Sequence, residues 1–263
     1  MNVDAPVDLL LREDADGVAT LTLNRPKQRN ALSRPLMAAL HGALDMIETD
    51  QSVKVVVIRG AGQGFCAGHD LKEVRGTPTR AFYEKLFAEC SALMMRIQSL
   101  RQPVIAEVHG IATAAGCQLV ATCDLAVADP DARFATPGVN IGLFCSTPMV
   151  AVSRAVGRKA AMKMLLTGDM VSAEEALGYG LVSHVAPEGA LRGETMKIAA
   201  QIASKSPLTL AIGKKAFYAQ SEMATADAYA YASEVMTTNM LARDAEEGID
   251  AFIEKRDPVW TGS

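Results

Sequence analysis

Two short stretches of small residues carry the residue types that could bind an anion through the backbone. The stretch His109 to Leu119, HGIATAAGCQL, follows the apolar run PVIAEV, and the stretch Gly62 to Val74, GQGFCAGHDLKEV, follows the run KVVVIRG. Each pattern predicts a strand, a turn and a helix start, where the first N–H groups lack partners inside the helix. Either the two turns form one pocket for an oxyanion, or they are tight turns in which glycine and alanine allow close packing.

Few reactive side chains accompany these turns. His69 would titrate close to neutrality, and Asp70 lies beside it in the chain. Cys145 is either a thiolate nucleophile or a small buried core residue. No CxxC pair occurs, and no histidine stands at ligand spacing from a cysteine, so the sequence indicates reduced thiols and no metal site. The five cysteines are Cys66, Cys90, Cys117, Cys123 and Cys145.

The apolar pattern predicts the elements that position the first turn. Residues 7–13 and 17–24 are expected to form two strands of a hairpin. Ser33 is expected to cap a helix, and the apolar run 53–60 is typical of a parallel strand that is covered on both faces. The apolar face of the helix carries Leu36, Leu40, Ala43, Leu44 and Ile47.

Strands and helices alternate up to about residue 147, which is typical of an α/β sheet. The second turn lies between the strand VIAEV, which Pro103 opens, and a helix that runs to about Cys123; a helix over 78–98 precedes them. The strand LAVA and the extended piece FATP follow. Helices then dominate, interrupted by LVSHVA, and Ser172 with Glu175 predicts a capping box. These helices are expected over 148–157, 158–167, 172–179, 188–205, 207–220, 224–241 and 244–255.

Two of the last helices carry more apolar surface than one small helical layer requires. Their stripes form either a subunit interface or the core of the helical lobe. The stripes consist of Leu208, Ile212 and Ala216, and of Tyr229, Ala232 and Met236.

Composition excludes several classes of protein. The chain has 263 residues, 49% of them hydrophobic, and this is enough for one globular unit with a sizeable core. A net charge of −4 without a dense basic block argues against a nucleic-acid surface. No segment reaches the roughly 18 apolar residues that a membrane span requires. The first residues, MNVDAPVDLLLRED, lack a basic region followed by an apolar run, so a cytoplasmic protein is expected.

Several ordered segments resemble the enoyl-CoA hydratase/isomerase (crotonase) family over nearly the whole chain. They are NRPKQRNAL, GQGFCAGHDLKEV, VIAEVHGIATAAGCQLVATCDLAVA, FATPGVNIGL, LTGDMVSAEEALGYGLVSHV and FIEKRDPVW. The run from TAAGC to FCSTP is especially similar to one subgroup of the family. The resemblance implies an α/β fold with a crotonase-like spiral of ββα units over 1–200. It also implies a helical C-terminal trimerisation region over 201–263, and a homotrimer or a hexamer that is a dimer of trimers.

The resemblance further implies an acyl-CoA substrate whose thioester oxygen is held by the backbone N–H groups of His69 and Ala115. Removing one such donor in comparable sites costs about 3 to 4 kcal/mol of transition-state stabilisation. Coenzyme A is then part of the substrate, and no further cofactor is implied. Arg25 could add a phosphate contact, and every charged candidate could equally be a solvated surface residue. The residues implied in CoA binding are Cys66, Ala67, Gly68, Asp70, Leu71, Lys72, Lys27, Phe252 and Lys255, the last two often from a neighbouring subunit.

Two departures from the family pattern concern proton transfer. The positions where hydratases of the family carry glutamates hold Gln118 and Gly138. An amide can orient a water molecule but has no proton to exchange near pH 7. General acid–base assistance is typically worth about 10² to 10⁴ in rate, so hydration is expected to be weak or replaced.

Three functions remain open from the sequence. The protein is a hydratase-like or isomerase-like enzyme with a water that Gln118 orients, or an acyl-CoA enzyme of changed reaction. The changed reaction would be thioester hydrolysis or a lyase step that uses Cys145, His69 or Asp70. In the third alternative the protein binds acyl-CoA without catalysis.

Overall fold

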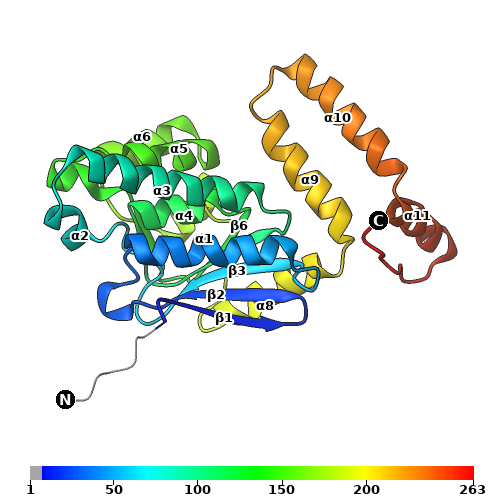
Figure 1. Ribbon diagram of the computed structural model, residues 1–263, viewed down its shortest axis with the longest axis horizontal. Helices are drawn as coiled ribbons and strands as arrows, with labels where there is room; N and C mark the ends of the chain where they lie inside the picture. The colour runs from blue at the N-terminus through cyan, green and yellow to red at the C-terminus, as the bar shows by residue number, and fades with distance from the viewer. Residues whose placement is uncertain (1–7) are drawn as a thin grey trace.

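A six-stranded sheet forms the central layer of the computed structural model, which describes residues 8–263 (Figure 1). Residue 7 of the predicted first strand and most of the N-terminal segment used for the localisation argument lie outside this range. The strands follow the order β1-β2-β3-β4-β6-β9, and all neighbours are parallel except the hairpin β1–β2. They are β1 (Leu10–Ala15), β2 (Val18–Leu23), β3 (Val55–Gly60), β4 (Val104–Val108), β6 (Leu125–Ala128) and β9 (His184–Val185).

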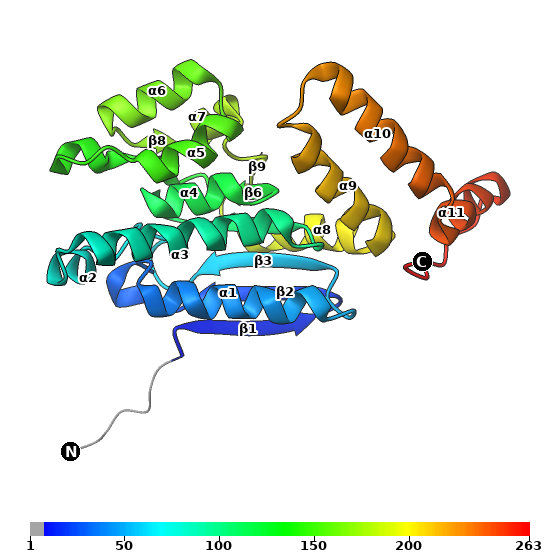
Figure 2. The same cartoon turned by 45° about the horizontal axis from the view of Figure 1, so that its top comes forward.

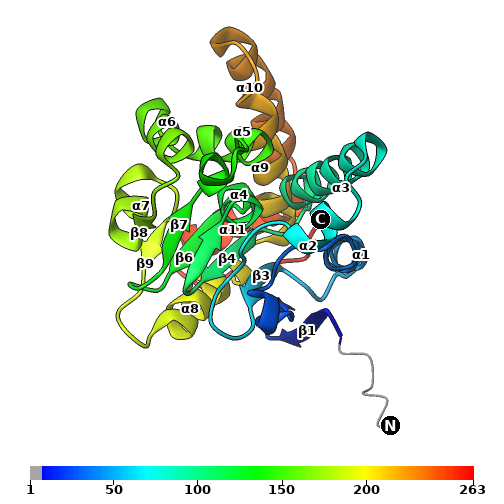
Figure 3. The same cartoon turned by 90° about the vertical axis from the view of Figure 1, so that its left-hand side faces the viewer.

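Alternating side chains of β3 enter two different cores, as the apolar run predicted. Val56 and Ile58 belong to the larger core, whereas Val55 and Val57 belong to a smaller one that includes Ala199. The larger core is covered by α1 (Arg34–Thr49), α3 (Arg80–Ser99) and α4 (Ala115–Thr122), and the smaller one by α8 (Leu191–Ala203). Figure 3 shows α8 on one face of the sheet and α1 and α4 on the other.

Local capping explains where several helices begin. The hydroxyl oxygen of Ser33 accepts the N–H of Leu36 at the start of α1, as predicted. Ser172 and Glu175 form the predicted capping box of α7 (Ala173–Tyr179). The helices α5 (Ser146–Ala155) and α6 (Arg158–Thr167) precede it, so α5 begins and ends two residues earlier than predicted.

The chain also forms elements that the sequence pattern does not predict. A second, small sheet has the order β5-β7-β8, and a short helix α2 follows the first turn motif. The strands are β5 (Ile111–Thr113), β7 (Arg133–Ala135) and β8 (Val171–Ser172), and α2 spans Leu71–Gly76. Two 3₁₀ helices, η1 (Pro26–Gln28) and η2 (Pro137–Ile141), complete the loops around these strands.

The last three helices extend away from the sheet (Figures 1 and 2). They are α9 (Pro207–Gln220), α10 (Thr225–Met240) and α11 (Arg243–Glu254). Neither α9 nor α10 contains a buried residue, and Tyr229 and Met236 of α10 are 74% and 59% exposed. The apolar stripe of α10 is therefore not the core of a helical lobe within one chain.

One buried charge cluster fixes α9 to the sheet. The Nζ of Lys214 lies 2.7 Å from a carboxylate oxygen of Asp124 and donates to the carbonyls of Ile97 and Gln102. The hydroxyl of Tyr218 donates to the other oxygen of Asp124 at 2.8 Å. The lysine is therefore paired and hydrogen-bonded, as a buried charge requires.

Candidate active site

The two turn motifs lie side by side and are joined by hydrogen bonds. Phe65 N–H donates to the carbonyl of His109 at 2.9 Å, and Cys66 N–H donates to the carbonyl of Ile111 at 3.0 Å. In return, Thr113 N–H donates to the carbonyl of Cys66 at 2.9 Å, and the Thr113 hydroxyl donates to the carbonyl of Ala67 at 3.1 Å. The structure thus brings together two segments that are more than 40 residues apart in the chain.

The backbone N–H groups of His69 and Ala115 lie at this junction without a partner in the described part of the chain, as do those of Gly116 and Cys117, the next two residues of α4. Among residues 8–263, neither His69 N–H nor Ala115 N–H donates a hydrogen bond. Gly68 lies between them, and a Cβ atom at this position would be 3.2 Å from the Ala115 nitrogen and 3.0 Å from the carbonyl oxygen of Thr113. The φ angle of Gly68 is +94°, which favours glycine. The close approach of the two turns therefore requires glycine, which has no side chain, at position 68.

An unusual backbone conformation precedes the second N–H group. Ala114 has φ 50° and ψ −118°, which is a costly region for a residue with a Cβ atom. Its N–H donates to the carbonyl of Ala135 at 2.9 Å, and this bond ties the turn to the end of β7. The conformation turns the chain sharply into α4, so that Ala115 N–H stands at the helix start.

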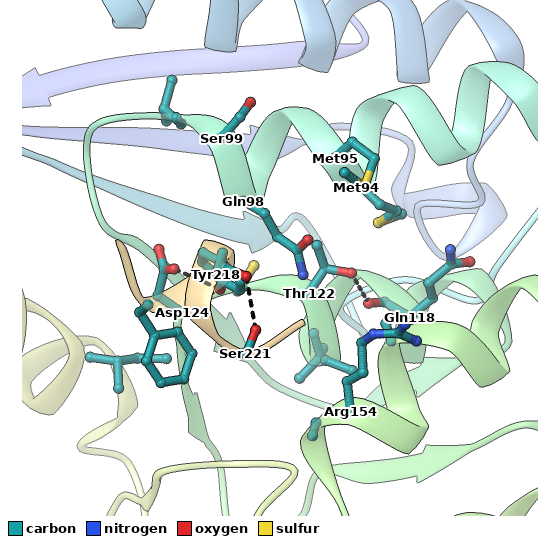
Figure 4. Close-up of a pocket in the computed structure, with 18 of the residues that line it drawn as sticks. Met94, Met95, Gln98, Ser99, Gln118, Thr122, Asp124, Arg154, Tyr218 and Ser221 are labelled. Carbon is teal, nitrogen blue, oxygen red and sulfur yellow. Dashed lines mark hydrogen bonds between the residues drawn. The ribbon is translucent and has the colours of Figure 1, made fainter. Parts of the chain in front are cut away.

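Gln118 lies one turn further along α4 and is 4% exposed. Its side-chain oxygen lies 3.9 Å from the Sγ of Cys90 on α3, a weak thiol contact. Its backbone carbonyl accepts the hydroxyl of Thr122 at 2.8 Å (Figure 4). The amide therefore lies between α4 and α3, at the position where the resemblance implies an acid.

Gly138 and Cys145 are in direct contact. A Cβ atom on Gly138 would lie 2.9 Å from the Sγ of Cys145 and 2.7 Å from the carbonyl oxygen of Leu143. Burial raises the pKa of the Cys145 thiol, although a backbone hydrogen bond from Gly138 partly opposes this. A thiol that is protonated at neutral pH is a poor nucleophile. These observations favour the core alternative for Cys145, and the other four cysteines are also free and buried.

Asp70 is occupied by structural contacts. One of its carboxylate oxygens accepts the N–H groups of Lys72 and Glu73 at the start of α2, and the other accepts Arg25 at 2.7 Å. Arg25 also donates to the carbonyl of Ala31 at 2.6 Å. Burial alone would raise the pKa of Asp70, but the hydrogen bonds from Arg25 and α2 hold this pKa below its usual range. Neither Asp70 nor Arg25 is therefore placed for proton transfer or phosphate binding.

The residues expected to bind CoA fall into two separate groups. Cys66, Ala67 and Gly68 lie in the first turn, while Leu71 and Lys72 are exposed on α2 and Lys27 is exposed on η1. The second group is Phe252, which is 85% exposed on α11, and Lys255 at the end of that helix. Figure 1 shows α2 and α11 at opposite ends of the molecule. One chain therefore does not bring the two groups together.

A cleft of about 1210 Å³ is lined by residues of α3, α4, α5 and α9. Gln118, Met94 and Thr122 line one side of the cleft, and Arg154 and Tyr218 line other parts (Figure 4). His69, Ala115 and Cys145 are not among the lining residues. The cleft thus reaches the predicted site only at Gln118.

Sequence reasoning did not identify four residues around the turns. Phe87 and Cys90 of α3 contact His69 and Gln118, but nothing in a helical apolar pattern shows which partners it meets. Thr136 has a buried hydroxyl without a partner in the described part of the chain. Asn30, at φ 54°, accepts the N–H of Arg25 and donates to the carbonyls of Ala61 and Gly64; an asparagine in a turn was the available signal.

A largely parallel sheet with paired strand-to-helix turns and a C-terminal group of helices defines the class of fold to which the chain belongs. The chain belongs to the enoyl-CoA hydratase/isomerase family, whose model matches residues 13–263.

Within this family it is similar to enoyl-CoA hydratase domain-containing protein 3, mitochondrial, of Xenopus laevis, with 48% identity that covers 98% of this chain and 87% of that protein. This is the subgroup that the run from TAAGC to FCSTP resembles, and the prediction is confirmed.

Solved structures confirm the predicted crotonase-like α/β fold with C-terminal helices. The crystal structure of human enoyl Coenzyme A hydratase domain-containing protein 3 superposes with a TM-score of 0.93 at 47% identity, covering 96% of this chain and 100% of that chain. An enoyl-CoA hydratase structure from Mycobacterium smegmatis gives a TM-score of 0.94 at 55% identity, covering 96% and 98% of the two chains.

The predicted cytoplasmic location is wrong. The similar proteins of Xenopus laevis, rat and human are named mitochondrial, which points to that compartment. The prediction failed because reduced thiols argue only against an oxidising compartment and do not distinguish the cytosol from other reducing ones.

Over residues 8–263, no helix is long and apolar enough to cross a membrane. In the same part of the chain, histidine, cysteine and acidic side chains form no group of three that could hold a metal ion.

Proposed function

We propose that this protein is an acyl-CoA enzyme that holds the thioester carbonyl oxygen between the backbone N–H groups of His69 and Ala115. The observation that carries the proposal is the pair of unpartnered N–H groups on either side of Gly68. Two fixed donors stabilise negative charge on the oxygen in the transition state, by roughly 3 kcal/mol for each donor. The α-carbon then becomes acidic and the β-carbon electrophilic.

Hydration by two glutamates is not the reaction that these residues support best. Gln118 has no exchangeable proton near pH 7, and the space beside Gly138 is taken by Cys145 and Leu143. The amide of Gln118 can orient a water molecule, so we expect at most weak hydration. Of the other candidates, the Cys145 thiol is protonated and Asp70 is engaged by Arg25. Of the three sequence candidates His69 remains, and the other histidine of the turns, His109, contacts the carbonyl of Gly62 at 2.9 Å.

We further propose that a second subunit completes the CoA site. Phe252 and Lys255 are exposed at the far end of the chain, as are Leu241 (85%) and Ile253 (70%) of the same helical region. Large exposed apolar groups of this kind favour an interface between subunits. The proposed assembly is a homotrimer or a dimer of trimers, with 1–200 as the core and 201–263 as the trimerisation region. Light scattering would measure the mass of this assembly.

The substitution Gly68→Ala tests the carbonyl-binding pocket. Its Cβ atom would crowd the Ala115 nitrogen and oppose the positive φ angle of residue 68. We expect the infrared band of the thioester carbonyl of butyryl-CoA to shift on binding to the natural protein and not to shift with Gly68→Ala. Free CoA, which lacks the thioester carbonyl, should bind both proteins with similar affinity.

Gly42→Ala is the matched control, because a Cβ atom at Gly42 meets nothing within 4 Å. This variant should retain the carbonyl shift. An unchanged shift in Gly68→Ala would contradict the proposed oxygen site. Binding of butyryl-CoA with a carbonyl shift but with no product from a panel of acyl-CoA thioesters would instead support the non-catalytic alternative.

A further inference from the structure

We propose that the imidazole of His69 is a base that removes a proton from the α-carbon of a bound acyl-CoA thioester. The inference rests on the proposed function, in which the backbone N–H of the same residue holds the thioester oxygen. It adds a catalytic side chain where the family's acidic positions hold Gln118 and Gly138.

Neither ring nitrogen of His69 has a well-formed hydrogen bond. The Nδ1 and Nε2 atoms are buried and make no hydrogen bond of standard geometry within residues 8–263, and the backbone of Leu32 lies near enough to raise the pKa of the ring. Buried polar side-chain atoms are normally hydrogen-bonded, so an imidazole with two unpartnered nitrogens requires an explanation. A substrate or a water molecule that enters the site would supply the missing partner.

Helix α3 shows where the imidazole lies. The ring of His69 packs edge-on against Phe87, with 5.9 Å between ring centroids and 71° between ring planes. The amide of Gln118 contacts Cys90 on the same helix. Because residues three apart share a helix face, Phe87 and Cys90 present His69 and Gln118 next to each other. Along the axis of α3 the two contacts are separated by about 4.5 Å.

The proposed oxygen donor and the imidazole belong to the same residue. A thioester oxygen that accepts the His69 N–H would lie about 2.9 Å from that backbone nitrogen. Gln118 lies at the position where the resemblance implies an acid, and its contact on α3, Cys90, is three residues from Phe87, the contact of the His69 ring. The Cys90 thiol that contacts Gln118 is neutral, which leaves the imidazole as the candidate base.

The ring is in the protonation state that a base requires. Burial lowers the pKa of His69, while the nearby backbone of Leu32 and the carboxylate of Glu73 on α2 act in the opposite direction. On α3, burial raises the pKa of Cys90 to about 12, so this thiol is neutral. A neutral imidazole has one nitrogen with a free lone pair and can accept a proton near pH 7.

The step is balanced without any further reactant. The lone pair of one ring nitrogen takes the α-proton, and the C–H electron pair forms the C=C bond of an enolate. The carbonyl electron pair moves onto the oxygen, which His69 N–H and Ala115 N–H stabilise. The imidazolium then returns a proton to the α-carbon. In deuterated water the returned atom is deuterium, because the imidazolium exchanges with solvent.

Deuterium exchange at the α-carbon of butyryl-CoA tests the proposal, with the full chain in deuterated water and proton NMR or mass spectrometry as the readout. We expect the natural protein to catalyse exchange and His69→Ala to be slower by about 10² or more. The carbonyl infrared shift should persist in His69→Ala, because the substitution leaves the backbone N–H in place. Added imidazole should restore part of the exchange, which a purely structural role would not allow.

The half-buried His41, on α1, provides the matched control: His41→Ala should exchange at the natural rate. His69→Asn, which keeps a polar side chain, serves as a second variant if His69→Ala unfolds. Absence of the carbonyl shift in the natural protein would contradict the proposed function itself. A normal shift without exchange, or with equal exchange in the natural protein and a folded His69 variant, would overturn this inference alone.

Discussion

The Sγ of Cys145 packs against Gly138 so closely that residue 138 has no room for a side chain: a Cβ atom on Gly138 would be 2.9 Å from this sulfur. The carbonyl oxygen of Leu143 would be even closer, at 2.7 Å. The site therefore does not merely lack an acid at position 138. The segment from Leu143 to Cys145 has closed over the space that the acid would need.

Gly138→Ala should destabilise the fold. A Cβ atom at 2.7 to 2.9 Å forces the Leu143–Cys145 segment to move, and overpacking of this kind costs typically 1 to 3 kcal/mol. Urea unfolding measures the loss. Adding Cys145→Ala should recover only part of it, since the Leu143 carbonyl remains. Gly193→Ala in α8 is the control, because no atom lies within 4 Å of its Cβ position; a Gly138→Ala protein as stable as this control would contradict the packing argument.

Asp70→Asn should remove a stabilisation that depends on pH. The pKa of Asp70 is depressed in the folded protein, so its contribution is fully present above the unfolded pKa of about 3.9 and is lost as the pH falls through the folded value. We expect a loss of about 1 kcal/mol at pH 7, because asparagine keeps the helix cap but not the ion pair with Arg25. Urea unfolding from pH 7 to pH 3 checks this.

The difference between the natural protein and Asp70→Asn should shrink below about pH 4, where the unfolded carboxyl group begins to protonate. Asp131→Asn, at an exposed position outside the ion pairs, is the matched control and should show little difference at any pH. A constant difference between pH 7 and pH 3 would show that the Asp70 carboxylate does not provide the stabilisation.

Lys214→Met should loosen the attachment of α9. The substitution leaves Asp124 as a partly buried charge without its lysine, and removing one partner of a buried pair costs roughly 3 to 5 kcal/mol. Hydrogen exchange should become faster in α9, and urea unfolding should occur at lower concentration. Lys215→Met, on the exposed side of the same helix, should stay within about 0.5 kcal/mol. Equal stability of the two variants would show that the cluster around Asp124 does not fix α9.

Local patterns predicted most of the fold. The apolar run of β3 and the Ser33 cap of α1 each depend on neighbours in the chain, and both were predicted. The strands β5 and β8 have three and two residues, so they carry no period that a sequence could show. The helix α5 ends two residues earlier than predicted, because tertiary packing rather than intrinsic propensity decides where a helix ends.

Some features of the candidate site could be predicted from local sequence patterns, and others could not. The turns around Gly68 and Ala114 could be predicted because glycine and alanine mark close backbone approach locally. The contacts of His69 with Phe87 and of Gln118 with Cys90 could not, because they depend on how α3 crosses α4. The contact between Gly138 and Cys145 likewise depends on a loop closure over seven residues that no local pattern encodes.

The backbone character of the two free N–H groups at His69 and Ala115 has a consequence for how such a protein changes over generations. Any residue except proline supplies the same N–H, so nearly every substitution at these positions leaves the donors in place. In the site that we propose, the backbone binds the oxygen and side chains transfer protons, so the two functions can change separately. A lineage can exchange the side chains at positions 69, 118 and 138 and acquire a new reaction while the proposed oxygen site is retained.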